Sequence, residues 1–418
     1  MPRWKSWMAA AMWTSVASGA AACGGGSGGG AAGSADAASE GGDDGAAGGD
    51  DSAMEAGASD GTSPDGAGAN VDAGATEGGV HPDAGKGLDS GGDGQSEAGG
   101  ATGLHVVNNT LVDGNKVVRL LGVDRSGTEY MCIQGNGIYD GPVDQTAIAA
   151  ITAWHANAVR VPLNEDCWLD INGAPAQYSG SNYQNAIVAL VTTLRQAGLY
   201  VIVDLHWNNG GTAQATGQEQ MADADHAPDF WTSVANTFKS DQDVVFDLYN
   251  EPHDITWSCW LNGGCQVNGW NVAGMQQLLD AVRATGATNV VMAGGLAYAN
   301  DLTQWLANEP NDPLHNLTAS HHSYNFNTCS SQSCWTSQLA PVAQKVPLIT
   351  GELGENDCAH GYIDGYMSWA DSAGVSYLGW AWNADFNCNS GPSLITDYNG
   401  TATAFGAGLQ AHLAVVNP

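Results

Sequence analysis

Basic side chains are scarce in this chain. Its 418 residues include 11 Lys and Arg residues against 44 Asp and Glu residues, which gives a formal net charge of −33. A surface this acidic repels phosphate backbones and other polyanions. We therefore expect no nucleic acid partner and no anionic polymer, whereas the charge is compatible with a neutral substrate.

Large apolar side chains are almost missing from residues 24–103, which consist mainly of Gly, Ala, Ser and Asp. This stretch holds fifteen acidic residues against the single Lys86. Such a segment cannot bury enough apolar surface to offset the entropy cost of ordering, so we expect a disordered linker that acts as a tether. The folded, catalytic part of the chain should then run from 104 to 418.

Residues 1–23 contain no apolar run long enough to span a bilayer. Arg3 and Lys5 precede a short apolar stretch and then small residues that end at Cys23, which is the pattern of a bacterial-type export signal. The small residues before Cys23 make it a candidate for lipidation, with plain secretion as the alternative because Leu is usual where Ala20 stands. We expect an exported protein, secreted or held at the cell surface, whose only membrane contact is a lipid on Cys23.

No CxxC pair occurs in the chain, which argues against a zinc site, and an oxidising compartment favours disulfides. Sequence alone leaves many pairings of the eight cysteines in 104–418 open. The short spacings make Cys259–Cys265 and Cys329–Cys334 natural local bridges. The others would then pair as Cys132–Cys167 and Cys358–Cys388 and pin loops that follow adjacent strands.

No GxGxxG motif follows the first expected strand, which disfavours an open doubly wound sheet. Short apolar runs instead alternate with helical stretches such as 183–198 and 272–286. Eight strand–helix units predict an α/β fold in which a parallel sheet closes into a (β/α)8 TIM barrel. The expected strands are 117–123, 158–163, 200–206, 244–250, 289–294, 317–322, 347–350 and 375–382.

A hairpin turn signal precedes the barrel. The residues Asp113-Gly114-Asn115 separate two apolar runs, as in a two-stranded β-hairpin. We expect this N-terminal hairpin to cover the bottom of the barrel.

Two glutamates follow strand-like apolar runs, Glu251 in VVFDLYNEPHD and Glu352 in VPLITGELGEND. Acids at the carboxyl ends of barrel strands lie where α/β barrels carry out their chemistry. Two such carboxylates can divide glycosidic cleavage between a proton donor and a nucleophile. Glu355 lies farther into the loop than Glu352 and is the weaker candidate for the nucleophile. Glu129 and Glu165 are weaker still and are expected to cap loops or to contact distal sugars.

Other polar residues also stand at expected strand ends. Arg160 interrupts an apolar run and requires a carboxylate partner, and it would keep a nearby nucleophile ionised. His206 ends the third expected strand. Asn250 directly precedes Glu251, and neighbouring strand residues point to opposite faces, so Asn250 and Glu251 both reach the mouth of the barrel only if their strand ends or bulges there. The segment HHSY follows the sixth strand without an HExxH motif, so we expect no metal.

Tryptophans cluster at or just after the expected strand ends. Flat rings with polar edges suit the apolar faces of sugar rings, so together they predict a carbohydrate cleft. These residues are Trp168, Trp207, Trp257, Trp260, Trp335, Trp380 and Trp382.

The segment VFDLYNEPHD resembles the acid/base signature of glycoside hydrolase family 5, the cellulase family. The resemblance covers 104–418, because NAVRVPL, DLHW, YNEP, HSY, ITGE and WAWN follow in the family's order. It implies a retaining double displacement without cofactor or metal, with Glu251 as acid/base and Glu352 as nucleophile. It further implies supporting or substrate-binding roles for Arg160, His206, Asn250, His322, Tyr324 and Trp382. His322 is preferred to His321 because the pattern is His, any residue, Tyr, and Trp382 is preferred to Trp380.

The resemblance implies an endo-acting enzyme that cleaves β-1,4-linked glucan of the cellulose type, expected to be a monomer. A β-mannanase or another β-glycosidase of the family is the alternative, because loops select the polymer. A surface glycan-binding protein without activity is the alternative from another class, but it predicts a missing acid. Retaining chemistry requires the two carboxylates to lie roughly 5–5.5 Å apart. The charge of Glu352 should raise the pKa of Glu251.

Overall fold

The computed structural model describes residues 103–388 and 391–418. The expected export signal (1–23), the lipidation candidate Cys23 and all but the last residue of the expected linker (24–103) lie outside the described residues. Within the described ranges, none of the helices is both long and apolar enough to cross a membrane.

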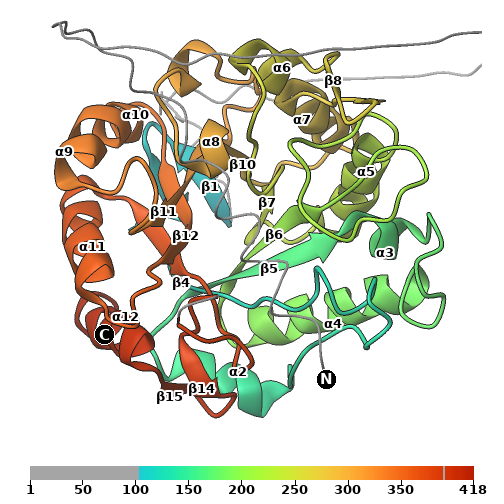
Figure 1. Ribbon diagram of the computed structural model, residues 1–418. Coiled ribbons are helices and arrows are strands. Elements are labelled where there is room, and N and C mark those ends of the chain that lie inside the picture. The colour runs from blue at the N-terminus through green and yellow to red at the C-terminus, as the bar shows by residue number, and fades with distance from the viewer. Residues whose placement is uncertain (1–102, 389–390) are drawn as a thin grey trace, which may run out of the picture. The chain divides into compact units, whose positions relative to one another are not determined.

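Eight parallel strands close into a barrel, as the alternation of apolar runs and helices predicts (Figure 1). The hydrogen-bonded order around the barrel is β4-β5-β6-β7-β10-β11-β12-β13, and β13 pairs with β4 to complete it. Gly122 allows the close approach of the first two strands, because a Cβ there would lie 1.8 Å from the Ala158 carbonyl oxygen. The barrel strands are β4 (Leu121–Asp124), β5 (Ala158–Asn164), β6 (Tyr200–Trp207), β7 (Val244–Asp247), β10 (Val291–Gly294), β11 (Leu317–Tyr324), β12 (Leu348–Gly354) and β13 (Ser376–Gly379).

Helices surround the barrel and bury their apolar sides against the outer face of the strands (Figure 1). The two helices expected at 183–198 and 272–286 form as α4 and α7. Local sequence determines where some helices begin and end. The Asp144 carboxylate caps the N-terminus of α2, and Gly374 takes the left-handed conformation that ends α11. The longer helices are α2 (Gln145–Thr152), α4 (Ser181–Gln196), α5 (Ala227–Phe238), α7 (Met275–Ala284), α11 (Gly361–Ala373) and α12 (Ala404–Val416). The short ones are α3 (Glu165–Leu169), α6 (Trp257–Asn262), α8 (Leu296–Ala299), η2 (Trp305–Ala307), α9 (Gln332–Cys334), η3 (Trp335–Leu339) and α10 (Ala340–Ala343).

A three-stranded antiparallel sheet closes the amino-terminal end of the barrel. It consists of β1 (Leu104–Val107), β2 (Thr110–Asp113) and β3 (Lys116–Val118), and its β2–β3 hairpin confirms the expected turn. Leu104 and Leu111 pack in one apolar cluster with residues from the barrel strands, such as Ile202 and Ile349. The N-terminal sheet therefore covers the bottom of the barrel.

Several expected strand boundaries are wrong. The run 117–123 is divided between β3 and β4, because the hairpin turn draws its first residues into pairing with β2. The strand expected at 244–250 ends at Asp247, and the one expected at 375–382 ends at Gly379. Two small hairpin sheets lie in loops; their strands are β8 (Gln266–Val267), β9 (Trp270–Asn271), β14 (Ile395–Asp397) and β15 (Thr401–Ala402).

Four disulfides form in the described part of the chain, in the expected pairing. Cys259–Cys265 and Cys329–Cys334 close short loops. Cys132–Cys167 joins the loop after β4 to α3, and Cys358–Cys388 joins the loops after β12 and β13, which are neighbours in the barrel. Four bridges in one domain indicate an oxidising compartment outside the cytoplasm.

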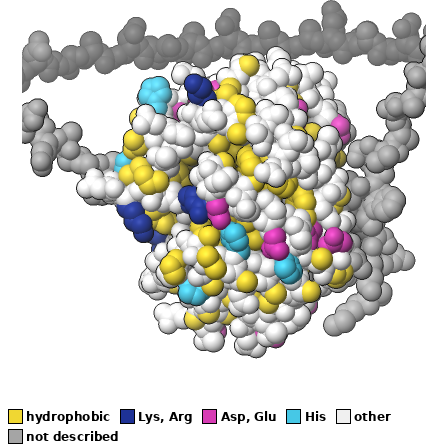
Figure 2. Space-filling model, turned by 90° about the vertical axis from the view of Figure 1, so that its left-hand side faces the viewer, with side chains coloured by type: hydrophobic (Ala, Val, Ile, Leu, Met, Phe, Trp, Pro, Cys, Tyr) yellow, Lys and Arg dark blue, Asp and Glu magenta, His cyan; other side chains and the backbone are white. Residues whose placement is uncertain are grey.

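Charged side chains are dispersed over the face of the folded domain that Figure 2 draws. On the face drawn in Figure 2, acidic and basic side chains occur singly or in small groups among polar and apolar atoms. This face therefore offers no broad basic patch of the kind that nucleic acid requires.

Candidate active site

The structure brings Glu251 and Glu352 together at the carboxyl end of the barrel. Glu352 lies in β12, where the strand pairing is irregular between Thr350 and Leu353. Glu251 lies beyond β7, and one of its carboxylate oxygens lies within 4.8 Å of a carboxylate oxygen of Glu352. The two acids, a hundred positions apart in sequence, thus face each other across a short gap.

The early end of β7 at Asp247 explains how two consecutive residues reach the same site. Neighbouring residues of a strand point to opposite faces, but that alternation no longer applies once the strand has ended. Asn250 accepts a hydrogen bond from Arg160 at 2.7 Å, and the next residue, Glu251, turns its carboxylate to His322.

Arg160 is fully buried at the centre of the site. Its guanidinium lies 3.0 Å from the Glu352 carboxylate, and it contacts three further acids within 3.2 Å. These acids, which sequence reasoning did not single out, are Asp124, Asp204 and Asp247. Each is an acid inside an apolar strand (LGVD, VIVDLH, VVFD), and that anomaly is the signal that could have found them.

The buried acids around Arg160 do not all behave as free carboxylates. Burial is the main cause that raises the pKa of Asp247 to about 7, and the Arg160 charge opposes the rise. Burial likewise raises the pKa of Asp124 well above its usual range. The cluster can therefore hold protons at neutral pH, which limits the excess of negative charge around one guanidinium.

Tyr324 and His322 complete the contacts of the two glutamates. The Tyr324 hydroxyl donates a hydrogen bond to Glu352 Oε2 at 2.5 Å. His322 Nδ1 lies 2.9 Å from Glu251 Oε1 and 3.6 Å from Glu352 Oε2. Burial lowers the pKa of His322 to about 4, so its ring is neutral at physiological pH. His321 instead stacks against Tyr366 of α11, so His322 is the histidine that reaches the site.

Gln218 is a site residue that the sequence did not reveal. Its side-chain amide accepts a hydrogen bond from Asn250 Nδ2 at 3.0 Å and donates one to the Glu251 carbonyl oxygen at 2.9 Å. It lies on the long connection between β6 and α5, where no motif surrounds it. Loop residues that act through side-chain hydrogen bonds leave no periodic signal in sequence.

His206 and Trp380 form one wall of the site. His206 Nδ1 lies 2.8 Å from Asp204 Oδ2, and its ring stacks on Trp380 with the centroids 5.3 Å apart. Burial is the largest single effect and disfavours the charged imidazolium, but the charge of Asp204, the hydrogen bond to it and the charge of Glu129 together raise the pKa of His206.

The preference for Trp382 over Trp380 is wrong. Trp382 is buried in the core, where its ring packs edge-on against Trp154 at 4.9 Å. Because β13 ends at Gly379, strand alternation no longer determines which of the two rings faces the mouth. Trp380 belongs with Tyr324, Ala381 and Phe386 in a small cluster beside the glutamates.

Most of the other clustered tryptophans are packing residues. Trp168, Trp260 and Trp335 are buried, and each indole N–H donates to a neighbouring protein oxygen. Of the seven tryptophans, only Trp207 is partly exposed, and its ring lies next to Tyr130. The interpretation of all seven as a carbohydrate platform is therefore too broad.

The pKa of Glu251 is raised, as expected for a proton donor, but for a different reason. Burial of the side chain, which is only 17% exposed, is the main cause, and nearby hydrogen bonds and positive charges oppose it. The charge of Glu352 is not among the main causes, so the expected electrostatic origin is wrong. Removal from water disfavours the charged carboxylate by itself.

The weaker acidic candidates have structural positions. Glu355 Oε2 accepts hydrogen bonds from Tyr362 N and Ile363 N at the start of α11. Glu129 accepts one from Gly127 N and so caps its own loop. Glu165 is fully buried, which excludes the expected contact with distal sugars.

Among the described residues, two groups of side chains have donor atoms close enough to hold a cation: Glu251 with His322 and Glu352, and Glu165 with Asp223 and His226. In the first group, Arg160 and Tyr324 already bond both oxygens of Glu352. That group is better suited to proton transfer and nucleophilic attack than to ligation.

Comparison with known proteins agrees with this geometry. The family model "Cellulase (glycosyl hydrolase family 5)" matches residues 123–386. The chain is 24% identical over 272 residues to a mannan endo-1,4-beta-mannosidase of Cellvibrio japonicus and 28% identical over 193 residues to the manganese dependent endoglucanase Eg5A of Phanerodontia chrysosporium. These alignments cover 62% and 44% of this chain, and the chain spans about half of each relative, 56% and 45%.

A solved structure shares the fold. The beta-glucanase SdGluc5_26A of Saccharophagus degradans superposes with a TM-score of 0.58 at 18% identity, over 76% of this chain and 94% of that one. Because the family model spans more than half of the chain, this protein belongs to glycosyl hydrolase family 5, the cellulase family.

Proposed function

We propose that this chain is an endo-acting, retaining glycoside hydrolase that cleaves β-1,4-linked glucan by double displacement. The observation that carries the proposal is the separation of the two glutamates, whose nearest oxygens lie within 4.8 Å. Retaining enzymes hold their carboxyl groups roughly 5–5.5 Å apart, whereas inverting enzymes leave roughly 6.5–9.5 Å for a water molecule.

In the first step, Glu352 attacks the anomeric carbon, and Glu251 gives its proton to the departing glycosidic oxygen. The bond to the leaving sugar breaks and a covalent bond to Glu352 forms. In the second step, Glu251 removes a proton from water, which attacks the same carbon and releases Glu352. Each step inverts the configuration of the anomeric carbon, so the two steps together retain it.

The neighbours of the two acids fit these roles. Arg160 and Tyr324 donate hydrogen bonds to separate oxygens of Glu352, which stabilises the carboxylate needed for attack. The neutral His322 adds no positive charge beside Glu251. Asn250, held by Arg160 and Gln218, is placed beside the acid to bond the sugar 2-hydroxyl, a contact that strengthens in the transition state. His206 and Trp380 supply a flat wall for the sugar ring.

Two polymers are candidates for the substrate. Relatives are named both as endoglucanases and as mannan endo-1,4-beta-mannosidases, so a β-mannan is the second candidate. A glycan-binding protein without activity is disfavoured, because both acids and their hydrogen-bond partners are present.

The amino-terminal region suits export and tethering. We propose that residues 1–23 direct export, that Cys23 carries a lipid, and that 24–103 tether a monomeric barrel to the cell surface.

Release of reducing sugars from soluble cellulose, barley glucan, mannan and xylan tests the proposal. We expect hydrolysis of a β-1,4-glucan, and loss of at least 10³-fold in kcat for Glu251→Gln and for Glu352→Gln. Glu355→Gln is the matched control, since this acid lies three residues from Glu352 but bonds only to backbone N–H groups. Hydrolysis that survives both substitutions, or no hydrolysis of any polymer, contradicts the proposal.

A further inference from the structure

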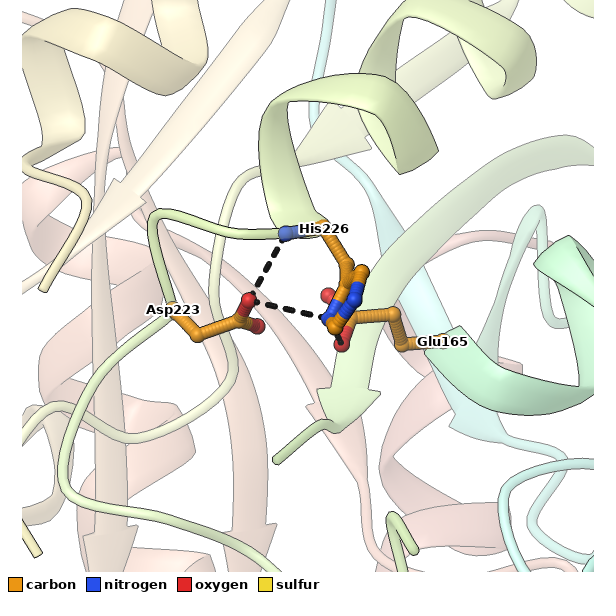
Figure 3. A group of neighbouring side chains, drawn as sticks. All are labelled: Glu165, Asp223 and His226. Atoms are coloured by element: carbon orange, nitrogen blue, oxygen red, sulfur yellow. Dashed lines mark hydrogen bonds and ion pairs between the residues drawn. The ribbon is translucent and has the colours of Figure 1, made fainter. Parts of the chain in front are cut away.

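A second cluster of ionisable side chains lies outside the proposed catalytic site. Glu165 is the first residue of α3, directly after β5, while Asp223 and His226 lie at the end of the connection that leads to α5. The three side chains converge on one point (Figure 3). His226 Nδ1 lies 3.4 Å from Asp223 Oδ1 and 4.0 Å from Glu165 Oε1.

The Glu165 carboxylate has no partner that accounts for its burial. It is fully buried, and neither of its oxygens makes a well-formed hydrogen bond, although the Asn209 backbone N–H and the Asp223 carboxyl lie beside it. Among the ion pairs of the described residues, Glu165 and Asp223 each meet only His226, with no Lys or Arg. A buried, unpaired carboxylate is costly and is normally matched by a cation or protonated.

Asp223, in contrast, is firmly positioned. Its Oδ1 accepts hydrogen bonds from the backbone N–H groups of Asp225 and His226, and its Oδ2 accepts one from Asn208 Nδ2 at 3.1 Å. Asn208 is in turn held by the Tyr249 hydroxyl at 2.9 Å. The cluster is therefore built on a fixed frame, with Glu165 directed into it.

We propose that Glu165, Asp223 and His226 bind one divalent cation of the kind that accepts mixed carboxylate and imidazole ligands, Mn²⁺ or Zn²⁺. Ligands about 2.1 Å from one such ion lie roughly 3.0–3.5 Å apart. The three donor atoms lie within 4.8 Å of one another, so they draw closer together when the ion binds. The His226 side chain is 24% exposed although its Nδ1 is buried, so the three ligand atoms lie just beneath the surface. Water fills the remaining coordination positions.

Bound in this way, the cation fastens the connection between β6 and α5 to α3. That connection carries Gln218, which bonds Asn250 and the Glu251 backbone. The cation is thus a structural ion that holds a loop of the proposed catalytic site, and it takes no part in bond cleavage. When the cation is absent, burial and, after it, the charge of Asp223 raise the pKa of Glu165 well above its usual range. A proton therefore competes with the cation for Glu165.

The test uses the exported protein, dialysed against a chelator and titrated separately with Mn²⁺, Zn²⁺ and Ca²⁺. We expect one Mn²⁺ or Zn²⁺ per chain by calorimetry and elemental analysis, and a Tm rise of roughly 5 °C at a hundredfold excess over Kd. These readouts do not depend on glycan hydrolysis. Failure of the catalytic proposal therefore leaves them interpretable.

Glu165→Gln should abolish binding and the Tm rise, and Glu219→Gln should keep both. Glu219 is the matched control because it lies on the same connection, with its carboxylate bonded to Asn268. His226→Gln, at a partly exposed position, gives the same answer if Glu165→Gln does not fold. The proposal is overturned if none of the three ions binds, if binding survives Glu165→Gln or His226→Gln, or if only Ca²⁺ binds, because His226 would then not be a ligand.

Discussion

Arg160 shows how much of the site depends on a single side chain. It is fully buried and lies within 3.2 Å of four carboxylates. Taking one cation and several acids out of water is costly. The acids share the guanidinium, and burial raises the pKa of Asp124 and of Asp247, which favours their neutral forms. Removing the cation would leave those acids buried and uncompensated.

Replacing Arg160 by Met should therefore lower the free energy of unfolding by about 3–5 kcal/mol. Arg195→Met is the matched control, because Arg195 pairs with Asp241 and Asp243 on a side chain that is 21% exposed, and such a pair contributes about 1 kcal/mol or less. Urea unfolding of both variants measures the difference. Equal losses for the two variants would show that the buried cluster does not need its cation.

The raised pKa of Glu251 predicts the pH dependence of activity. The proton donor must be protonated, so kcat/KM should fall as pH rises through the pKa of Glu251, which burial places above that of an exposed glutamate. The pH profile of kcat/KM measures this fall in activity at high pH. Glu251→Ala, assayed with a dinitrophenyl glycoside whose leaving group needs no acid, should lose it. If kcat/KM instead falls at the pH where an ordinary carboxyl titrates, or if the fall persists in Glu251→Ala, the group that titrates is not Glu251.

Sequence reasoning at the residue scale located both glutamates and most of their neighbours, because charged groups at strand ends stand out against apolar runs. It missed Gln218 because a loop residue has no periodic context. It chose Trp382 over Trp380 because the orientation of a side chain beyond the end of a strand depends on the loop backbone.

At the scale of elements, the existence of the eight strands was predictable and their ends were not. β7 ends at Asp247 although the apolar run continues to Tyr249, and the strand pairing shifts between His321 and His322 in β11. Both irregularities direct side chains toward the mouth of the barrel. Strand ends of this kind depend on tertiary packing, which apolar pattern alone does not encode.

The turn α8 carries backbone strain near the site. Ala297 has φ 54° and Tyr298 has φ 61°, in the left-handed region that disfavours residues with a Cβ. The Tyr298 ring stacks on His253, two residues after Glu251, with the centroids 4.2 Å apart. The strained turn thus presents an aromatic ring beside the acid/base loop.

Ala297→Gly should raise the free energy of unfolding by about 0.5–1 kcal/mol, because glycine adopts this exposed left-handed position without a steric penalty. Ala189→Gly, at an exposed position inside α4, is the same substitution with the opposite expected sign, a loss of about 1 kcal/mol. Thermal unfolding compares the two. A loss in both variants would mean that the α8 turn is unstrained.

For the whole molecule, the barrel and its four disulfides followed from the alternation of strands and helices and from cysteine spacing. The sequence did not reveal the third strand of the bottom sheet, because β1 resembles a short extension of the hairpin. It also did not show that Glu165, Asp223 and His226 meet, since long-range proximity among loops depends on the closed fold.

The disulfides should contribute unequally to the stability of the barrel. Cys132–Cys167 spans 35 positions and Cys329–Cys334 spans 5, so loop-closure entropy predicts about 4 and about 2 kcal/mol of stabilisation. Replacing each pair by Ala should lower Tm more for the long bridge, where both cysteines are also fully buried. Calorimetry of the two double variants measures this order, and a reversed order would contradict the entropy argument.

The most direct test of the account is to identify the residue that forms the covalent intermediate. A 2-deoxy-2-fluoro glycoside with a good leaving group, built on the sugar of the preferred polymer, forms the glycosyl-enzyme quickly and releases it slowly, so mass spectrometry can map the label. We predict one label per chain, on the peptide that contains Glu352, and none on Glu352→Gln. A label on any other residue, or no label on an enzyme that hydrolyses the polymer, would contradict the account.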